Sequence, residues 1–279
     1  MTRKSIDLPD LPTPDVVEAL DFESIRSAIL KDLNSRLDEQ TIDLESEPLI
    51  KLIEAFAYRE LLLRQRINDS AQAVMLATAQ GNDLDNLAAL LDVERQSGES
   101  DERFRKRVQL AHESYTAAGT AGAYEWHALD ASQAVTDVTA QFVAPGKVDV
   151  VVMGTDGPLV AAELDKVRGR IQSDKVKPLT DQVTVRNARV KTVDVVASLV
   201  LFDGPDSATV QQQAIEAVRA YGDRVHRLGY DITVSGLISA LHVTGVQRAV
   251  VHQPGDDVMA ADDELTRLGE ITVTFDGRV

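Results

Sequence analysis

The densest apolar segment of the chain lies in its first half, between Leu49 and Leu63, where eleven of fifteen residues are apolar, Ala or Tyr. Pro48 suits the first turn of a helix, where its missing N–H costs nothing. The pattern therefore predicts one long helix from Pro48 to about Ala79, with Gly81 as its stop. At ~1.5 Å per residue this helix would form a rod of about 48 Å.

A helix that is apolar on most faces must be covered on most faces. Two interpretations remain open: the rod is wrapped by its own chain, or it packs into a bundle with helices of other chains. A helical region of about 95 residues offers little to surround it on every side. The residues that we expect at such an interface are Leu49, Leu52, Ile53, Phe56, Leu62, Leu63, Ile67 and Val74.

The rest of the N-terminal part also favours helix. Residues 1–20 contain three prolines and are interpreted as an extended arm. Residues 21–116 form the predicted helical region, with a short helix over 82–91 and a further helix that Ser100 caps.

After Tyr115 the pattern changes, and the segment Ala117–Gly122 is the best candidate for a domain boundary. Gly119 and Gly122 are the expected hinge residues. Thr120 is predicted to cap a short helix that ends near Asp130.

Alternating apolar residues then predict strands, separated by turns and short helices. Residues 117–190 contain strands at 135–143 and 147–153 around Pro145-Gly146, a helix at 157–171 and a strand near 182–190. Residues 191–279 contain a strand at 193–202, helices capped by Ser207 and Ser235, strands at 246–252 and 271–275, and a polar loop at 253–263. The predicted class is α+β: an N-terminal helical region with one long helix, then two small α+β domains in tandem.

Composition narrows the kinds of partner. The 29 Lys and Arg against 45 Asp and Glu give a net charge of -16, which disfavours nucleic acid and anionic membranes and suits basic protein partners. No cysteine is present, which excludes disulfides and thiolate metal sites. We find neither a signal peptide nor a membrane span in the sequence, and we expect a soluble protein made in the cytoplasm.

No residue pattern indicates catalysis, a cofactor or a metal. The five histidines lack the spacing of a helical zinc pair, and there is no Gly-x-Ser-x-Gly elbow. Gly119 and Gly122 lack the third glycine and the preceding strand of a dinucleotide-binding loop. The acidic loop 256–264 lacks the glycine and glutamate pattern of a calcium loop, so we interpret it as solvated.

Five ordered motifs together resemble a known family. They are EAFAYRELLLRQRIN from Glu54, AQGNDLDNLA from Ala79, ESDERFR from Glu99, GTAGAY from Gly119, and the segment from Val135 through Pro145-Gly146-Lys147-Val148. Their order is similar to that of the baseplate assembly protein J family, the baseplate J-like wedge proteins of contractile-tailed phages and phage-tail-like bacteriocins. The similarity runs from about Asp21 to the end and is strongest over residues 45–155.

The resemblance implies a structural wedge subunit without catalytic residues. Its long helix would join helices of a second copy and of tail protein I in a core bundle. The α+β domains would contact neighbouring wedges, and possible further partners are other baseplate, hub or sheath-initiator proteins. The implied location is the tail baseplate of a virion or phage-tail-like particle, assembled in the bacterial host cytoplasm.

Two other function classes were weighed. A cytoplasmic scaffold or adaptor would share the exposed helix, and neighbouring genes would distinguish it. A particle-associated hydrolase would need paired carboxylates in a cleft and activity on cell-wall sugars.

Overall fold

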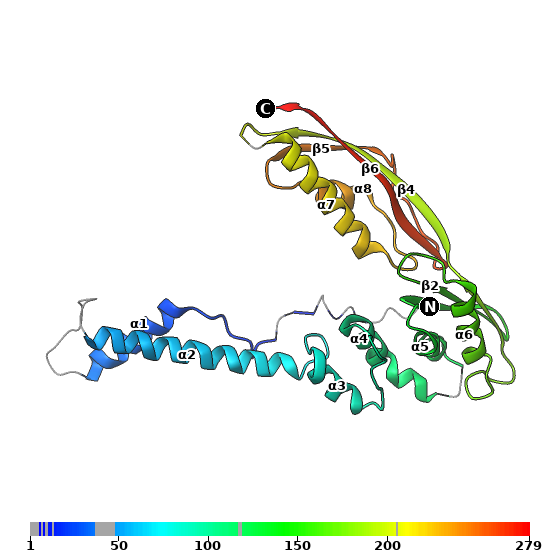
Figure 1. Ribbon diagram of the computed structural model, residues 1–279, viewed down its shortest axis with the longest axis horizontal. Coiled ribbons are helices and arrows are strands. Elements are labelled where there is room, and N and C mark those ends of the chain that lie inside the picture. The colour runs from blue at the N-terminus through cyan, green and yellow to red at the C-terminus, as the bar shows by residue number, and fades with distance from the viewer. Residues whose placement is uncertain are drawn as a thin grey trace. The chain divides into compact units, whose positions relative to one another are not determined.

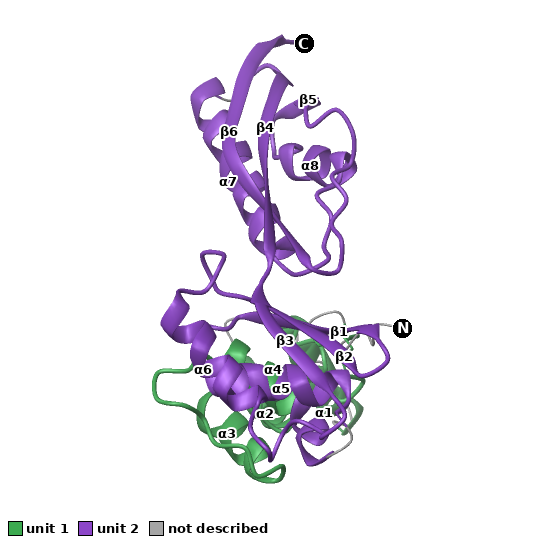
Figure 2. Ribbon diagram, turned by 90° about the vertical axis from the view of Figure 1, so that its right-hand side faces the viewer, with its two compact units in different colours: residues 1–109 green, residues 110–279 purple. Residues whose placement is uncertain are grey.

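The computed structural model describes residues 6, 8, 11–12, 14–36, 48–116, 119–204 and 206–279. It divides into two compact units, Met1–Gln109 and Leu110–Val279 (Figures 1 and 2). The described residues form eight α-helices and six strands, and the strands make two three-stranded sheets. This confirms the predicted α+β class, with a helical N-terminal part followed by two small sheets.

Unit 1 is helical in its described part. Its helices are α1 (Phe22–Arg36), α2 (Pro48–Ala73), α3 (Gly81–Ala89) and α4 (Asp101–Leu110). As predicted, Ser100 caps α4, because its Oγ accepts a hydrogen bond from the backbone N–H of Arg103 at 3.4 Å. The longest helix is α2, with 26 residues.

The C-terminal end of α2 differs from the prediction. The helix ends at Ala73 rather than near Ala79, and Gly81 begins α3 instead of ending α2. The physical reason is a tertiary contact: Arg105 donates hydrogen bonds to the carbonyls of Leu76 at 2.7 Å and Ala79 at 2.6 Å. These carbonyls bond to a guanidinium instead of to the next turn of a helix.

The first half of unit 2 is a sheet covered on one face by two helices. Its elements are η2 (Ala111–Tyr115, a 3₁₀ helix), α5 (Ala121–Ala131), β1 (Asp137–Ala144), β2 (Lys147–Met153), α6 (Ala161–Ile171) and β3 (Gln182–Asn187). The strand order is β1-β2-β3, antiparallel between β1 and β2 and parallel between β2 and β3. Thr120 caps α5 as predicted, by accepting from Ala123 N–H at 3.2 Å.

Strand alternation explains this core. Val150 and Val152 of β2 are fully buried and pack with Tyr124 of α5 and with Val167 and Ile171 of α6. Alternate residues of a strand point to opposite faces of the sheet. The helices therefore cover one face only, and part of the other face is polar.

The second half of unit 2 repeats this layering. Its elements are β4 (Arg189–Leu201), α7 (Ser207–Val225), α8 (Val234–Leu241), β5 (Val246–Gln253) and β6 (Glu264–Arg278). The strand order is β5-β4-β6, with β4 antiparallel to β5 and parallel to β6. The central strand β4 places Val195, Ala197, Leu199 and Leu201 in the core with α7 and α8.

Three local predictions in this half were wrong. The side chain that caps α7 is Asp206, not Ser207, and Thr233 rather than Ser235 caps α8. The last strand begins at Glu264, seven residues before the predicted Ile271. Its polar first half shows no apolar alternation, and it is held by pairing with β4 from Arg189 onward.

Candidate protein-interaction surface

One face of α2 is covered by α1. Ile50 and Ile53 of α2 are buried, at 2% and 3% exposure, against Ile29, Leu30 and Leu33 of α1. Ile53 was predicted at an interface with other chains, but here it belongs to the core of its own unit.

The N-terminal arm covers the same face of α2 farther along the helix. The side chain of Asn68 is buried and forms two hydrogen bonds with the backbone of Glu18: its Oδ1 accepts from the N–H at 3.1 Å, and its Nδ2 donates to the carbonyl at 2.8 Å. Arg64 also forms an ion pair with the Glu18 carboxylate at 3.1 Å. Contacts within unit 1 therefore bury one row of α2, which consists of Ile50, Ile53, Ala57 and Asn68.

A second row of α2 has no cover in the described part of unit 1. It consists of Leu49, Leu52, Phe56, Leu63 and Ile67, which are 39%, 51%, 59%, 64% and 59% exposed, and we call it the α2 stripe. At about 100° per residue these five positions fall within about 60° of the helix circumference. The stripe is about 27 Å long at ~1.5 Å per residue. A contiguous exposed apolar row of this length is typical of an interaction surface.

Two other predicted interface residues lie off the stripe. Leu62 is 40% exposed and sits about 80° or more away around the helix, near the exposed Tyr58. Val74 is 68% exposed and lies just after the last residue of α2. Both remain available to a partner, but only the stripe forms a continuous row.

The two expected hinge glycines occupy crowded positions. Gly119 has φ +66°, and a Cβ there would lie 2.7 Å from Pro178 Cγ. Gly122 is in the first turn of α5, and a Cβ there would lie 2.6 Å from Glu113 Cγ. The structure thus gives both glycines a packing role, while Ala117 and Ala118 lie outside the described residues. The hinge stays a prediction.

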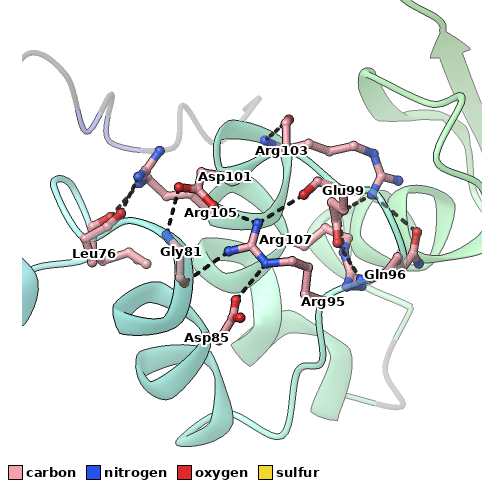
Figure 3. A network of polar contacts seen from close by, with 12 residues as sticks. Leu76, Gly81, Asp85, Arg95, Gln96, Glu99, Asp101, Arg103, Arg105 and Arg107 are labelled. Atoms are coloured by element: carbon pink, nitrogen blue, oxygen red, sulfur yellow. Dashed lines mark hydrogen bonds and ion pairs between the residues drawn. The ribbon is translucent and has the colours of Figure 1, made fainter.

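Sequence reasoning missed an arginine cluster in unit 1, formed by Arg95, Arg105 and Arg107 (Figure 3). Arg95 donates to Asp85 at 2.7 Å and pairs with Asp101 at 2.7 Å, and its guanidinium lies 4.5 Å from the centre of the Phe104 ring. The Asp101 carboxylate accepts from the Gly81 N–H and faces Arg95, and both contacts lower its pKa.

Arg107 is the most deeply buried member of the arginine cluster. Its side chain is 2% exposed, and it pairs with the fully buried carboxylate of Glu99 at 3.1 Å and donates to the Glu94 carbonyl at 2.6 Å. The motifs from Ala79 and from Glu99 supply most of these residues. A signal was present in the sequence, since ESDERFRKR places four cations in and beside a helix that carries a buried Phe.

Three other expectations from the sequence concern a metal site, a membrane-spanning helix and a solvated acidic loop, and each bears on the part of the chain that the structure describes. No group of three His, Asp or Glu side chains there could hold a metal ion. No described helix has the length and apolar character that a membrane crossing requires. In the acidic loop, Asp263 and Glu264 are not simply solvated: they pair with Arg186, Arg189 and Lys191.

Comparison with known proteins decides the family. Matches to the Baseplate J-like N-terminal domain, the Baseplate J-like central domain and the Baseplate J-like protein C-terminal domain cover residues 45–99, 116–187 and 193–274. The chain is 39% identical to Baseplate protein J of Escherichia phage P2 over 98% of both proteins. The chain belongs to the baseplate J-like family.

The chain is also similar to one protein in a solved structure of a phage-tail-like particle. It aligns with a chain of the anti-feeding prophage baseplate at 17% identity, TM-score 0.41, over 64% of this chain and 43% of that one.

Proposed function

We propose that this baseplate J-like protein is a structural subunit of a contractile-tail baseplate. The supporting similarity is the full-length match to the P2 protein, and the proposed role is mechanical rather than enzymatic. In this proposal the chain forms wedges with a second copy and tail protein I, and the wedges form a ring around the hub. A contraction trigger of this kind needs interfaces with two stable arrangements rather than a reactive centre.

The observation that carries the proposal is the uncovered α2 stripe. α1 and the arm occupy one row of α2, and the stripe lies about 100° from that row, so the described part of unit 1 leaves it exposed. An exposed apolar row beside a covered one is what a helix bundle completed by other chains requires.

The decisive test is Phe56→Asp. A charge in the middle of the stripe would have to be buried without a partner, which is strongly unfavourable, so we expect loss of the complex with tail protein I. Co-purification from a co-expression strain measures this. The matched control is Phe142→Asp, a Phe on β1 that is 75% exposed and lies outside the stripe. If Phe56→Asp co-purifies as well as wild type while remaining folded, the bundle role of α2 is wrong.

A further inference from the structure

Two exposed arginines border the α2 stripe along one edge. Arg59 and Arg66 are seven residues apart, and at about 100° per residue they lie within about 20° of each other. They sit between the stripe and the side of α2 that carries Leu62. We call them the arginine row.

The arginine row has no carboxylate partner in the described part of the chain. Most other ionic groups of α2 are paired: Arg64 pairs with Glu60 at 2.7 Å and with Glu18, and Glu54 pairs with Lys51 at 2.9 Å. The exposed Asp69 forms no ion pair with Arg66 among the described residues. The chain as a whole is acidic, at -16, yet its principal exposed apolar row is bordered by unpaired positive charge.

Covering the stripe would change the surroundings of these arginines. A helix packed on Leu52, Phe56 and Leu63 excludes water from the neighbouring edge positions as well. A cation that loses water without gaining a carboxylate is strongly unfavourable. The covering helix must therefore bring acidic residues to Arg59 and Arg66.

A second copy of α2 is a poor source of these acids. In an antiparallel pair of identical helices the same edges meet, so each arginine row would face another arginine row. In a parallel pair the row would face the opposite edge, where Glu60 already pairs with Arg64.

We infer that the helix along the arginine row comes from a different chain and carries Asp or Glu about seven residues apart, beside its own apolar stripe. This deepens the proposed function and rests on it, because it names the chemistry of the partner at the α2 stripe. The second copy of this protein would then contact other surfaces of the bundle.

Zero-length cross-linking tests this directly. Arg59→Lys/Arg66→Lys keeps both positive charges and introduces amines that a carbodiimide joins only to carboxylates in contact with them. Complete particles that contain this full-length variant are treated and digested, and the cross-linked peptides are identified by mass spectrometry. Three native pairs serve as positive controls for the cross-linking reaction, because the Lys Nζ lies within 3 Å of a Glu carboxylate oxygen in each. They are Lys51–Glu54, Lys166–Glu163 and Lys191–Glu264.

The expected product links residue 59 or 66 to Asp or Glu in a helix of another protein, and it is absent when the isolated chain is treated. A link between residues 66 and 69 is expected from their i,i+3 spacing and does not bear on the inference. A link to a second copy of this chain, any other link of residue 59 or 66 within the isolated chain, or no link to another protein in particles that show the native pairs would each overturn the inference.

Charge reversal gives an independent readout. We expect Arg59→Glu/Arg66→Glu to reduce the number of complete tails by about tenfold or more, because carboxylates would face carboxylates. The control is Lys31→Glu/Arg219→Glu, which reverses two exposed cations on helices other than α2. If Phe56→Asp abolishes assembly while the arginine reversal is silent, the inference fails and the proposed function stands. If Phe56→Asp is also silent, the proposed function itself fails.

Discussion

At the scale of single residues, His127 shows how burial and nearby charges shift the pKa of a side chain. Its ring lies in α5, is 8% exposed and packs edge-on against Trp126 with centroids 5.0 Å apart. Burial lowers the pKa of His127, the positive charge of Arg170 on α6 lowers it further, and Asp130 opposes the shift. The folded state therefore favours the neutral form of the imidazole.

This predicts a stability that depends on pH. Because the unfolded chain binds the proton more readily, stability falls as the pH drops below about 6.5, the ordinary pKa of histidine. We expect His127→Gln to remove part of this loss, measured as the difference in melting temperature between pH 7.5 and pH 5.5. The control is His112→Gln, at an exposed position. An identical pH dependence in wild type and His127→Gln would contradict the prediction.

At the scale of elements, the arginine cluster holds α4 against the end of the α2 segment. Arg105 donates hydrogen bonds to two carbonyls that follow α2. Arg95 bonds Asp85 in the middle of α3 and Asp101 at the start of α4, and Arg107 and Glu99 are buried together. Residues 76–110 are therefore tied by side-chain contacts that join several short elements. These charge pairs act together with a small apolar core formed by Leu84, Ala88, Val93, Phe104 and Val108.

Removing Arg107 tests this account. In Arg107→Ala the buried Glu99 carboxylate keeps only Arg103 as an ionic partner, so we expect a loss of about 3 kcal/mol in the free energy of unfolding of unit 1. Chemical denaturation followed by helical circular dichroism measures it. Arg36→Ala is the control, since Arg36 pairs with Asp32 on an exposed helix surface and its removal should change little. Equal effects of the two substitutions would show that burial is not the cause.

At the scale of the whole molecule, the two sheets of unit 2 share a small junction. Leu265 and Leu228 of the second half pack with Val151, Met153 and Ala188. Beside this cluster, Arg186 bridges Asp149 and Asp263, both at 2.7 Å. The domain boundaries at residues 20, 116 and 190 stay predictions.

Loss of the bridge should loosen the junction. We expect Arg186→Ala to speed hydrogen exchange in β2 and in the segment around Asp263, because Asp149 would lose this cation and Asp263 would keep only its pair with Arg189. Lys166→Ala, which removes an exposed ion pair on α6, serves as the control. Unchanged exchange at both segments would show that the apolar cluster alone holds the junction.

Features that depend on a few neighbouring residues could be predicted from the amino-acid sequence. Thr120 and Ser100 cap the helices that they were predicted to cap, and Pro145-Gly146 joins an antiparallel pair of strands. Such signals are local, because a cap or a turn is decided within about four residues. The excess of apolar residues after Pro48 was also visible, since it depends only on composition and periodicity.

Which of those apolar residues are covered depends on packing between helices and could not be predicted from the sequence. Ile53 and Phe56 are three residues apart and equally apolar, yet α1 buries the first and leaves the second exposed. The end of α2 and the start of β6 depend on Arg105 and on pairing with β4 in the same way. In each case the deciding atoms come from segments that are distant in the chain, so no window of neighbouring residues contains them.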